Sequence, residues 1–167
     1  MSSTQDVIVV GVDGSPASDR ALEWAMQEGR RRGCAVEVVT AFGNGTHLGS
    51  LAESTLTAEA RQRAESVQAL QITRFAEPYR TEVTLAAQVV EGPAVDRLVD
   101  AARHASLLVV GSHGYGLVHQ VLVGSVAAGC IRRASCPVVV LPARQLEPLQ
   151  AHSLQARASD APQSATH

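Results

Sequence analysis

Five short apolar runs alternate along the chain with four segments of helical periodicity, and this order is the feature that most constrains the fold. The runs are rich in β-branched residues and are followed by turn-forming residues, as expected for strands buried on both faces. They span residues 6–12, 35–42, 81–90, 107–110 and 137–141. Because each connection is long enough for a right-handed crossover, the sequence predicts an α/β fold: an open, doubly wound, mostly parallel sheet with helices on both faces.

The helical segments are recognised by their ends and by their apolar stripes. Ser15-Pro16 offers an N-cap and a first-turn proline, and Gly33 ends this first helix. The other stripes are Leu56, Ala60, Ala64, Val67 and Leu70; Ala94, Val95, Leu98, Val99 and Ala102; and Val126, Ala127, Cys130, Ile131 and Ala134. The first of these three stripes predicts a helix that ends before Pro78, and residues 43–53 before it are expected to form a mobile loop.

Length and composition indicate one domain with a tail. The predicted domain covers residues 1–142, whereas residues 143–167 lack apolar periodicity and are expected to be disordered. Neither a secretory signal pattern nor an apolar stretch of ~20 residues is present in the sequence, which favours a cytoplasmic protein that does not enter a membrane. A net charge of -2 provides no electrostatic attraction toward nucleic acid.

Three cysteines, Cys34, Cys130 and Cys136, match neither a C-x-x-C pair nor a metal-binding spacing. Free Cys is commonly buried, so we expect free thiols without a chemical role. Redox sensing by one of them is the alternative.

Two loops that follow predicted strands carry the residues suited to a ligand, because open parallel sheets bind ligands beyond the carboxyl ends of their strands. The first loop, residues 11–15, has small residues for a tight turn and Asp13, whose carboxylate could accept hydrogen bonds from ribose hydroxyls. Taken alone, this loop could equally be a strand-end turn that caps the first helix.

The second loop is more specific: Gly111-Ser112-His113-Gly114, nine residues, and then Gly124-Ser125 at the start of a helix. Its glycines could bring the backbone close to a ligand, and the helix start could offer N–H groups to phosphate oxygens. The sequence lacks both the G-x-x-x-x-G-K-[ST] pattern and the G-x-G-x-x-G fingerprint, which excludes those two nucleotide-binding motifs. The loop sequences also contain no Lys or Arg, which argues against efficient phosphoryl transfer.

Residues 10–15, Gly111–Gly114, the nine-residue spacer and Gly124-Ser125-Val126 resemble the universal stress protein family, and the resemblance covers roughly residues 5 to 142. It implies a five-stranded sheet in the order 3-2-1-4-5 and membership of the ATP-binding branch. It further implies adenosine beside residues 11–13, the base bordered by Ala41 and Val90, Gly111 near the ribose, and phosphates around residues 113–114 and 124–126. The nucleotide-binding residues proposed in this way are Gly11, Val12, Asp13, Ala41, Val90, Gly111, Ser112, His113, Gly114, Gly124, Ser125 and Val126.

The cofactors expected are ATP and Mg²⁺, with Asp13 and Ser125 as candidate oxygen ligands of a Mg²⁺ that arrives with the nucleotide. The leading hypothesis is a nucleotide-dependent regulator of the stress response. One alternative is a slow ATP hydrolase in which Asp13 and His113 position water. The other is a nucleotide-independent dimeric scaffold. Strand 137–141 would lie at a sheet edge, so we expect a homodimer through antiparallel pairing of this strand, and the alternative is an edge covered by the C-terminal tail.

Overall fold

The structure is a computed structural model of the 167-residue chain that describes residues 6–43, 51–113 and 123–143, without the side chains of 51–55. Within these ranges it contains one parallel sheet in the order β3-β2-β1-β4-β5, which confirms the predicted fold class and strand order. The strands are β1 (Val7–Gly11), β2 (Ala35–Phe42), β3 (Leu85–Glu91), β4 (Leu107–Gly111) and β5 (Val138–Leu141). Because β1 lies between β2 and β4, the chain order reverses beside β1.

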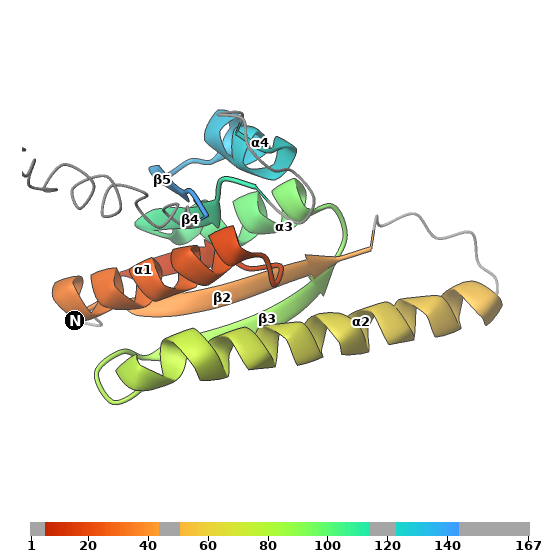
Figure 1. Cartoon of the computed structure of the whole chain (residues 1–167). Helices are drawn as coiled ribbons and strands as arrows, with labels where there is room; N and C mark the ends of the chain where they lie inside the picture. The colour runs from red at the N-terminus through yellow and green to blue at the C-terminus, as the bar shows by residue number, and fades with distance from the viewer. Residues whose placement is uncertain (1–5, 44–50, 114–122, 144–167) are drawn as a thin grey trace, which may run out of the picture.

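Helices cover both faces of the sheet (Figure 1). The helices α1 (Pro16–Arg32) and α2 (Leu51–Gln71) lie on one face, and α3 (Ala94–Ala101) and α4 (Ser125–Arg133) lie on the other. Alternate residues of each strand supply the two cores: Ile8 and Val10 of β1 pack with α1, whereas Val9 packs with α3 and α4. Burial on both faces explains why the strands read as continuous apolar runs.

The first helix begins and ends where the sequence predicts. The Ser15 hydroxyl accepts a hydrogen bond from the Ser18 N–H at 3.2 Å, and Pro16 occupies the first turn, where no intrahelical N–H bond is lost. Gly33 terminates the helix in the left-handed conformation, with φ of 69°, which glycine adopts without steric cost. This helix start fixes the segment that directly follows β1.

The third strand begins later than predicted, at Leu85 rather than residue 81. The N–H groups of Glu82 and Val83 both donate to the Tyr79 carbonyl, so this segment curls into a turn. Val83 is nevertheless buried in the core, which explains why its apolar character suggested a strand. Hydrogen bonding to β2 begins at Thr84, whose carbonyl accepts a hydrogen bond from the Val36 N–H.

The apolar stripe predicted for α2 is partly wrong. Leu56 and Leu70 are 66% and 58% exposed, and the helix begins at Leu51, inside the segment expected to be a loop. Two glutamines, Gln68 and Gln71, are instead buried against the rest of the protein. The helix continues into a π-helical turn at residues 72–76 and a 3₁₀ turn at 77–79 that contains Pro78.

The apolar stripe predicted for α4 is wrong at one residue. Ile131 is 52% exposed, so it does not belong to the buried stripe. All three cysteines are free, as predicted, and Cys34 and Cys130 are buried.

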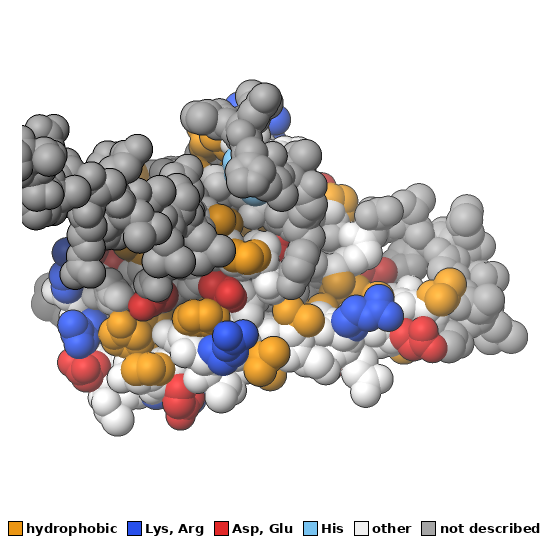
Figure 2. Space-filling model, viewed as in Figure 1, with side chains coloured by type: hydrophobic (Ala, Val, Ile, Leu, Met, Phe, Trp, Pro, Cys, Tyr) orange, Lys and Arg blue, Asp and Glu red, His pale blue; other side chains and the backbone are white. Residues whose placement is uncertain are grey.

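Residues 44–50 of the expected mobile loop and 144–167 of the expected tail lie outside the described residues. Among the helices that the structure describes, none is long and apolar enough to cross a bilayer. Figure 2 shows acidic and basic side chains interspersed over the visible face.

Candidate functional site

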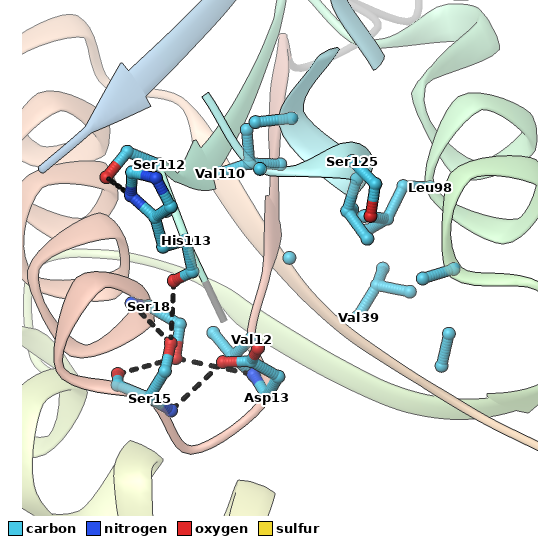
Figure 3. Close-up of a pocket in the computed structure, with 17 residues that line it drawn as sticks. Val12, Asp13, Ser15, Ser18, Val39, Leu98, Val110, Ser112, His113 and Ser125 are labelled. Atoms are coloured by element: carbon cyan, nitrogen blue, oxygen red, sulfur yellow. Dashed lines mark hydrogen bonds between the residues drawn. The ribbon is translucent and has the colours of Figure 1, made fainter. Parts of the chain in front are cut away.

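A cavity of about 270 Å³ opens where β1 and β4 end, between the loops that follow them and the start of α4 (Figure 3). Most of the residues proposed from the sequence line it: Gly11, Val12, Asp13, Ala41, Gly111, Ser112, His113, Gly124, Ser125 and Val126. Val90 pairs with Ala41 in the β2–β3 ladder but does not line the cavity. Gly114 lies outside the described residues. The structure therefore brings the two candidate loops to one site.

The backbone N–H groups of the loop after β1 already have hydrogen-bond acceptors within the protein. The N–H of Asp13 donates to Ser18 Oγ at 3.3 Å, that of Gly14 to Gln71 Oε1 at 2.8 Å, and that of Ser15 to Asp13 Oδ1 at 2.9 Å. Gly14 has a φ of 83°, which explains glycine at this point of the turn. Since these donors are occupied, the main polar group that the loop can offer a ligand is the Asp13 carboxylate, an acceptor for hydroxyl groups.

The loop after β4 is held from both sides. The Ser112 N–H donates to the Leu141 carbonyl and the Gly124 N–H donates to the Ser112 carbonyl, both at 2.7 Å. The Ser112 hydroxyl lies 3.0 Å from His113 Nδ1. These bonds connect the end of β4 to β5 and to the start of α4. Gly124 consequently contributes its N–H to the loop itself rather than to a ligand.

The start of α4 is the part of the cavity best suited to an anion. Gly124 is the N-cap and supplies no side-chain hydrogen bond, and the first N–H groups of a helix have no acceptor within the helix. The helix dipole adds a partial positive charge there. Ser125, Val126 and Ala127, the first three residues of α4, apart from its cap, line the cavity. Phosphate groups bind commonly at such helix starts.

The remaining wall of the cavity is apolar. Val39 of β2, Leu98 of α3 and Val110 of β4 face it, and Figure 3 shows Val39 and Leu98 near Ser125. Among the described residues that line the cavity there is no Lys or Arg, and Asp13 is the one acidic residue. The cavity can thus accept an apolar or aromatic group, a hydroxyl donor and an anion at separate places.

Gly111 is required for packing. A Cβ at this position would lie 2.8 Å from the backbone carbon of Ala17 and 2.9 Å from the backbone nitrogen of Ser18. The missing side chain therefore permits β4 to approach α1. The small size of this glycine was also expected to serve close approach of a ligand, and Gly111 does line the cavity.

Sequence reasoning missed several residues that line the cavity. They are Ser15, Ser18, Val39, Ala94, Leu98, Val110 and Ala127. The strand members could have been found, because side chains alternate along a strand and Val39 lies on the same face as Ala41. Gln71 accepts a hydrogen bond from the loop after β1 without lining the cavity. It was missed because a polar residue was not expected on the buried face of α2.

The fold and the cavity define an open-sheet α/β protein with a cavity where the strand order reverses, the place at which such sheets commonly bind ligands. The chain matches the universal stress protein family over residues 5–142, and it belongs to that family. This confirms the family resemblance seen in the sequence.

Among curated relatives, Universal stress protein Rv1996 of Mycobacterium tuberculosis is 30% identical over 152 residues, covering 81% of this chain and 47% of that protein. A universal stress protein of Mycolicibacterium smegmatis is 29% identical over 147 residues, covering 84% and 49% respectively. The chain thus spans about half the length of these curated relatives.

Solved structures of the family have the same fold. A universal stress protein in complex with cAMP is 28% identical, with a TM-score of 0.62, and the match covers 85% of this chain and 100% of that one. The universal stress protein from Archaeoglobus fulgidus in complex with dAMP is 25% identical, with a TM-score of 0.51 and coverages of 81% and 97%. UspA from Lactobacillus plantarum, at 20% identity and a TM-score of 0.71, supports the fold alone.

Proposed function

We propose that this protein binds an adenine nucleotide, ATP in the first instance, in the cavity at the ends of β1 and β4, and acts in the cytoplasm as a nucleotide-dependent regulator of the stress response. The observation that carries the proposal is the cavity itself, in which an apolar wall, a carboxylate and a helix start lie around one space of about 270 Å³. The relatives solved with cAMP and dAMP support adenine nucleotides as the ligand class.

The proposed arrangement follows from the chemistry of each wall. The adenine ring packs against Val39, Ala41 and Leu98, because a flat aromatic group gains most from burial among apolar side chains. The ribose hydroxyls donate to the Asp13 carboxylate. The phosphates extend toward the N–H groups at the start of α4, beside Ser125 and Val126.

Mg²⁺ fits the donor set that the cavity provides. A carboxylate at Asp13 and a hydroxyl at Ser125 are hard oxygen donors of the kind that Mg²⁺ accepts alongside phosphates and water. Asp13 Oδ1 already accepts from the Ser15 N–H, which leaves the second carboxylate oxygen for an ion or a ribose. Bound with the nucleotide, Mg²⁺ would neutralise phosphate charge in a cavity whose described lining holds no Lys or Arg.

Isothermal titration calorimetry with Mg·ATP, cAMP and dAMP tests the proposal. The decisive variant is Ala41→Phe, which fills the space assigned to the base. Its matched control is Ala86→Phe, the same substitution at an exposed position of β3 outside the cavity. Saturable binding that is lost in Ala41→Phe and kept in Ala86→Phe is the expected result. Absence of saturable heat with all three nucleotides overturns the proposal.

Two further measurements address the alternative functions. Mass spectrometry of small molecules released from the purified protein should detect an adenine nucleotide, whereas a nucleotide-independent scaffold would release none. Steady-state phosphate release from Mg·ATP should not exceed the buffer rate. A rate that exceeds it and is abolished in Asp13→Ala would instead favour the slow hydrolase.

We also propose that β5 mediates a homodimer. It is the edge strand of the sheet. The Pro137 carbonyl accepts from Leu108 of β4 and the Leu141 carbonyl accepts from Ser112 directly after β4, so the N–H groups of Val138 and Val140 point away from β4. Val140→Pro removes one outward N–H and should shift the protein toward a monomer in light scattering. A mass of one chain for the unmodified protein would refute the dimer.

A further inference from the structure

Helix α2 reaches the candidate site through one buried side chain, Gln71, which is 4% exposed. Its Oε1 accepts a hydrogen bond from the Gly14 N–H at 2.8 Å. Its Nε2 donates to Ser18 Oγ at 3.0 Å and to Asp19 Oδ1 at 2.6 Å. A buried amide is costly unless its hydrogen bonds are made. All of these bonds go to Gly14 in the loop after β1 and to Ser18 and Asp19 at the start of α1.

The bonds of Gln71 fix the peptide units on which Asp13 depends. The Gly14 N–H belongs to the peptide that directly follows Asp13, and Gly14 is a residue with little conformational restriction of its own. Ser18 Oγ, the second partner of Gln71, also accepts from the Asp13 N–H and donates to the Ser15 carbonyl. Gln71 therefore restrains both peptides adjoining Asp13, one directly and one through Ser18, although it does not line the cavity.

A second glutamine on the same helix provides the comparison. Gln68 is 6% exposed and lies almost one turn before Gln71. Its Nε2 donates to Thr40 Oγ1 at 3.0 Å and to the Gln88 carbonyl at 2.9 Å, and it lies 3.4 Å from the Val38 carbonyl. These partners belong to β2 and β3, and none of them is in the loop after β1. Gln68 thus shares the residue type, helix and burial of Gln71, but not its contact with the site.

We propose that Gln71 is a positioning residue for the ligand: it holds the loop around Asp13 in the conformation that accepts the ribose, and it thereby couples α2 to the site. This inference rests on the proposed nucleotide binding. An amide is the side chain required, because the position needs an acceptor toward Gly14 and donors toward Ser18 and Asp19. A carboxylate at the same place would face Asp19 without a donor.

The test compares Gln71→Met with the matched control Gln68→Met in the full chain. Calorimetry with Mg·ATP gives the dissociation constant, and urea unfolding gives the stability. Both variants should lose stability, because each leaves buried polar groups without partners. The dissociation constant should rise about tenfold in Gln71→Met, as for one or two lost hydrogen bonds, and less than about twofold in Gln68→Met.

The variant Gln71→Glu adds a readout that a purely structural role would not move. The dissociation constant of Gln71→Glu relative to that of the unmodified protein should be largest near pH 7. It should fall as the pH falls and the new carboxyl becomes protonated, since the neutral acid regains an acceptor and one of the two donors that the amide supplies. This series also decides the matter if Gln71→Met does not fold.

The outcomes separate the two proposals. If the unmodified protein does not bind any of the nucleotides, the proposed function fails. If it binds them and the Gln71 and Gln68 variants change the dissociation constant equally, the positioning role is overturned. A pH-independent affinity ratio for Gln71→Glu also overturns it.

Discussion

The Ser15 hydroxyl donates a hydrogen bond to the carbonyl oxygen of His113 at 3.4 Å, which joins residues that are 98 positions apart in the chain. Ser15 follows β1 and His113 follows β4, so this bond connects the two loops across the point where the strand order reverses. Figure 3 shows the contact at one side of the cavity. The same hydroxyl caps α1 by accepting from the Ser18 N–H. One buried side chain therefore serves both the helix and the site.

The two roles of Ser15 can be separated by substitution. Ser15→Ala should lower the free energy of unfolding by about 1 kcal/mol through loss of the N-cap, whereas Ser15→Gly should cost only a few tenths, because glycine is tolerated at this position. Both variants lose the bond to His113 and should weaken nucleotide binding to a similar extent. Urea unfolding and calorimetry check this. If the loss of affinity were instead larger in Ser15→Ala than in Ser15→Gly, in proportion to the loss of stability, the bond between the loops would have no separate effect.

The close approach of β4 to α1 leads to a prediction about two glycines. Gly111→Ala would place a methyl group against the backbone of Ala17 and Ser18, which cannot move without shifting the helix. We expect a loss of about 1–3 kcal/mol in the free energy of unfolding. In Gly11→Ala the methyl would instead meet the ends of the Leu98 side chain at 2.9 Å, and a side chain can rotate away. The loss should therefore be smaller for Gly11→Ala, and equal losses in thermal unfolding would contradict this explanation.

The buried carboxylate of Glu28 should make stability depend on pH. Burial by itself would raise the pKa of Glu28, but the hydrogen bonds from Arg32 and Arg31 outweigh it, and the pKa of the carboxyl is lowered. A lowered pKa in the folded state gives stability that is complete above the unfolded value of about 4.3 and is lost as the pH falls through the folded value. Urea unfolding from pH 7 to about pH 3 measures this dependence.

The control for this prediction is Glu28→Gln, which keeps the shape and removes the charge. Its stability deficit relative to the unmodified protein should be largest near neutral pH and should shrink in acid, where Glu28 itself becomes protonated. A deficit that stays constant over the whole range would show that the ion pairs with Arg31 and Arg32 do not contribute.

The strands and the first helix could be predicted because they depend on local signals. Buried parallel strands require apolar runs, and the capping pair Ser15-Pro16 fixes the first helix by short-range chemistry. The two candidate loops meet because strands β1 and β4 are neighbours, which followed from the family resemblance. These features require no knowledge of how side chains pack.

The features that were missed depend on tertiary contacts. Leu70 is exposed although its neighbour Gln71 is buried, because the hydrogen bonds of Gln71 to a loop 57 residues earlier outweigh what the apolar pattern favours. Val83 is buried without belonging to a strand, because the preceding turn curls it into the core. The packing role of Gly111 was likewise hidden, since it depends on a helix that approaches from elsewhere in the chain. The sequence did contain one signal for the buried face of α2. Gln68 and Gln71 follow Ala64 at helical spacing, so the three residues lie on one face of the helix.

The three thiols should react slowly in the folded protein. Burial raises the pKa of Cys34, Cys130 and Cys136, so each holds less thiolate near neutral pH, and the thiolate is the nucleophile. Cys130 is fully buried and Cys34 is 5% exposed, whereas Cys136 is partly exposed. Iodoacetamide labelling at pH 7.5, followed by peptide mass spectrometry, should therefore modify Cys136 first and Cys130 last. The same reaction in urea serves as the control and should label all three at similar rates. If Cys34 or Cys130 in the folded protein reacted as fast as a free thiol, the expectation of thiols without a chemical role would be wrong, and redox sensing would become the better explanation.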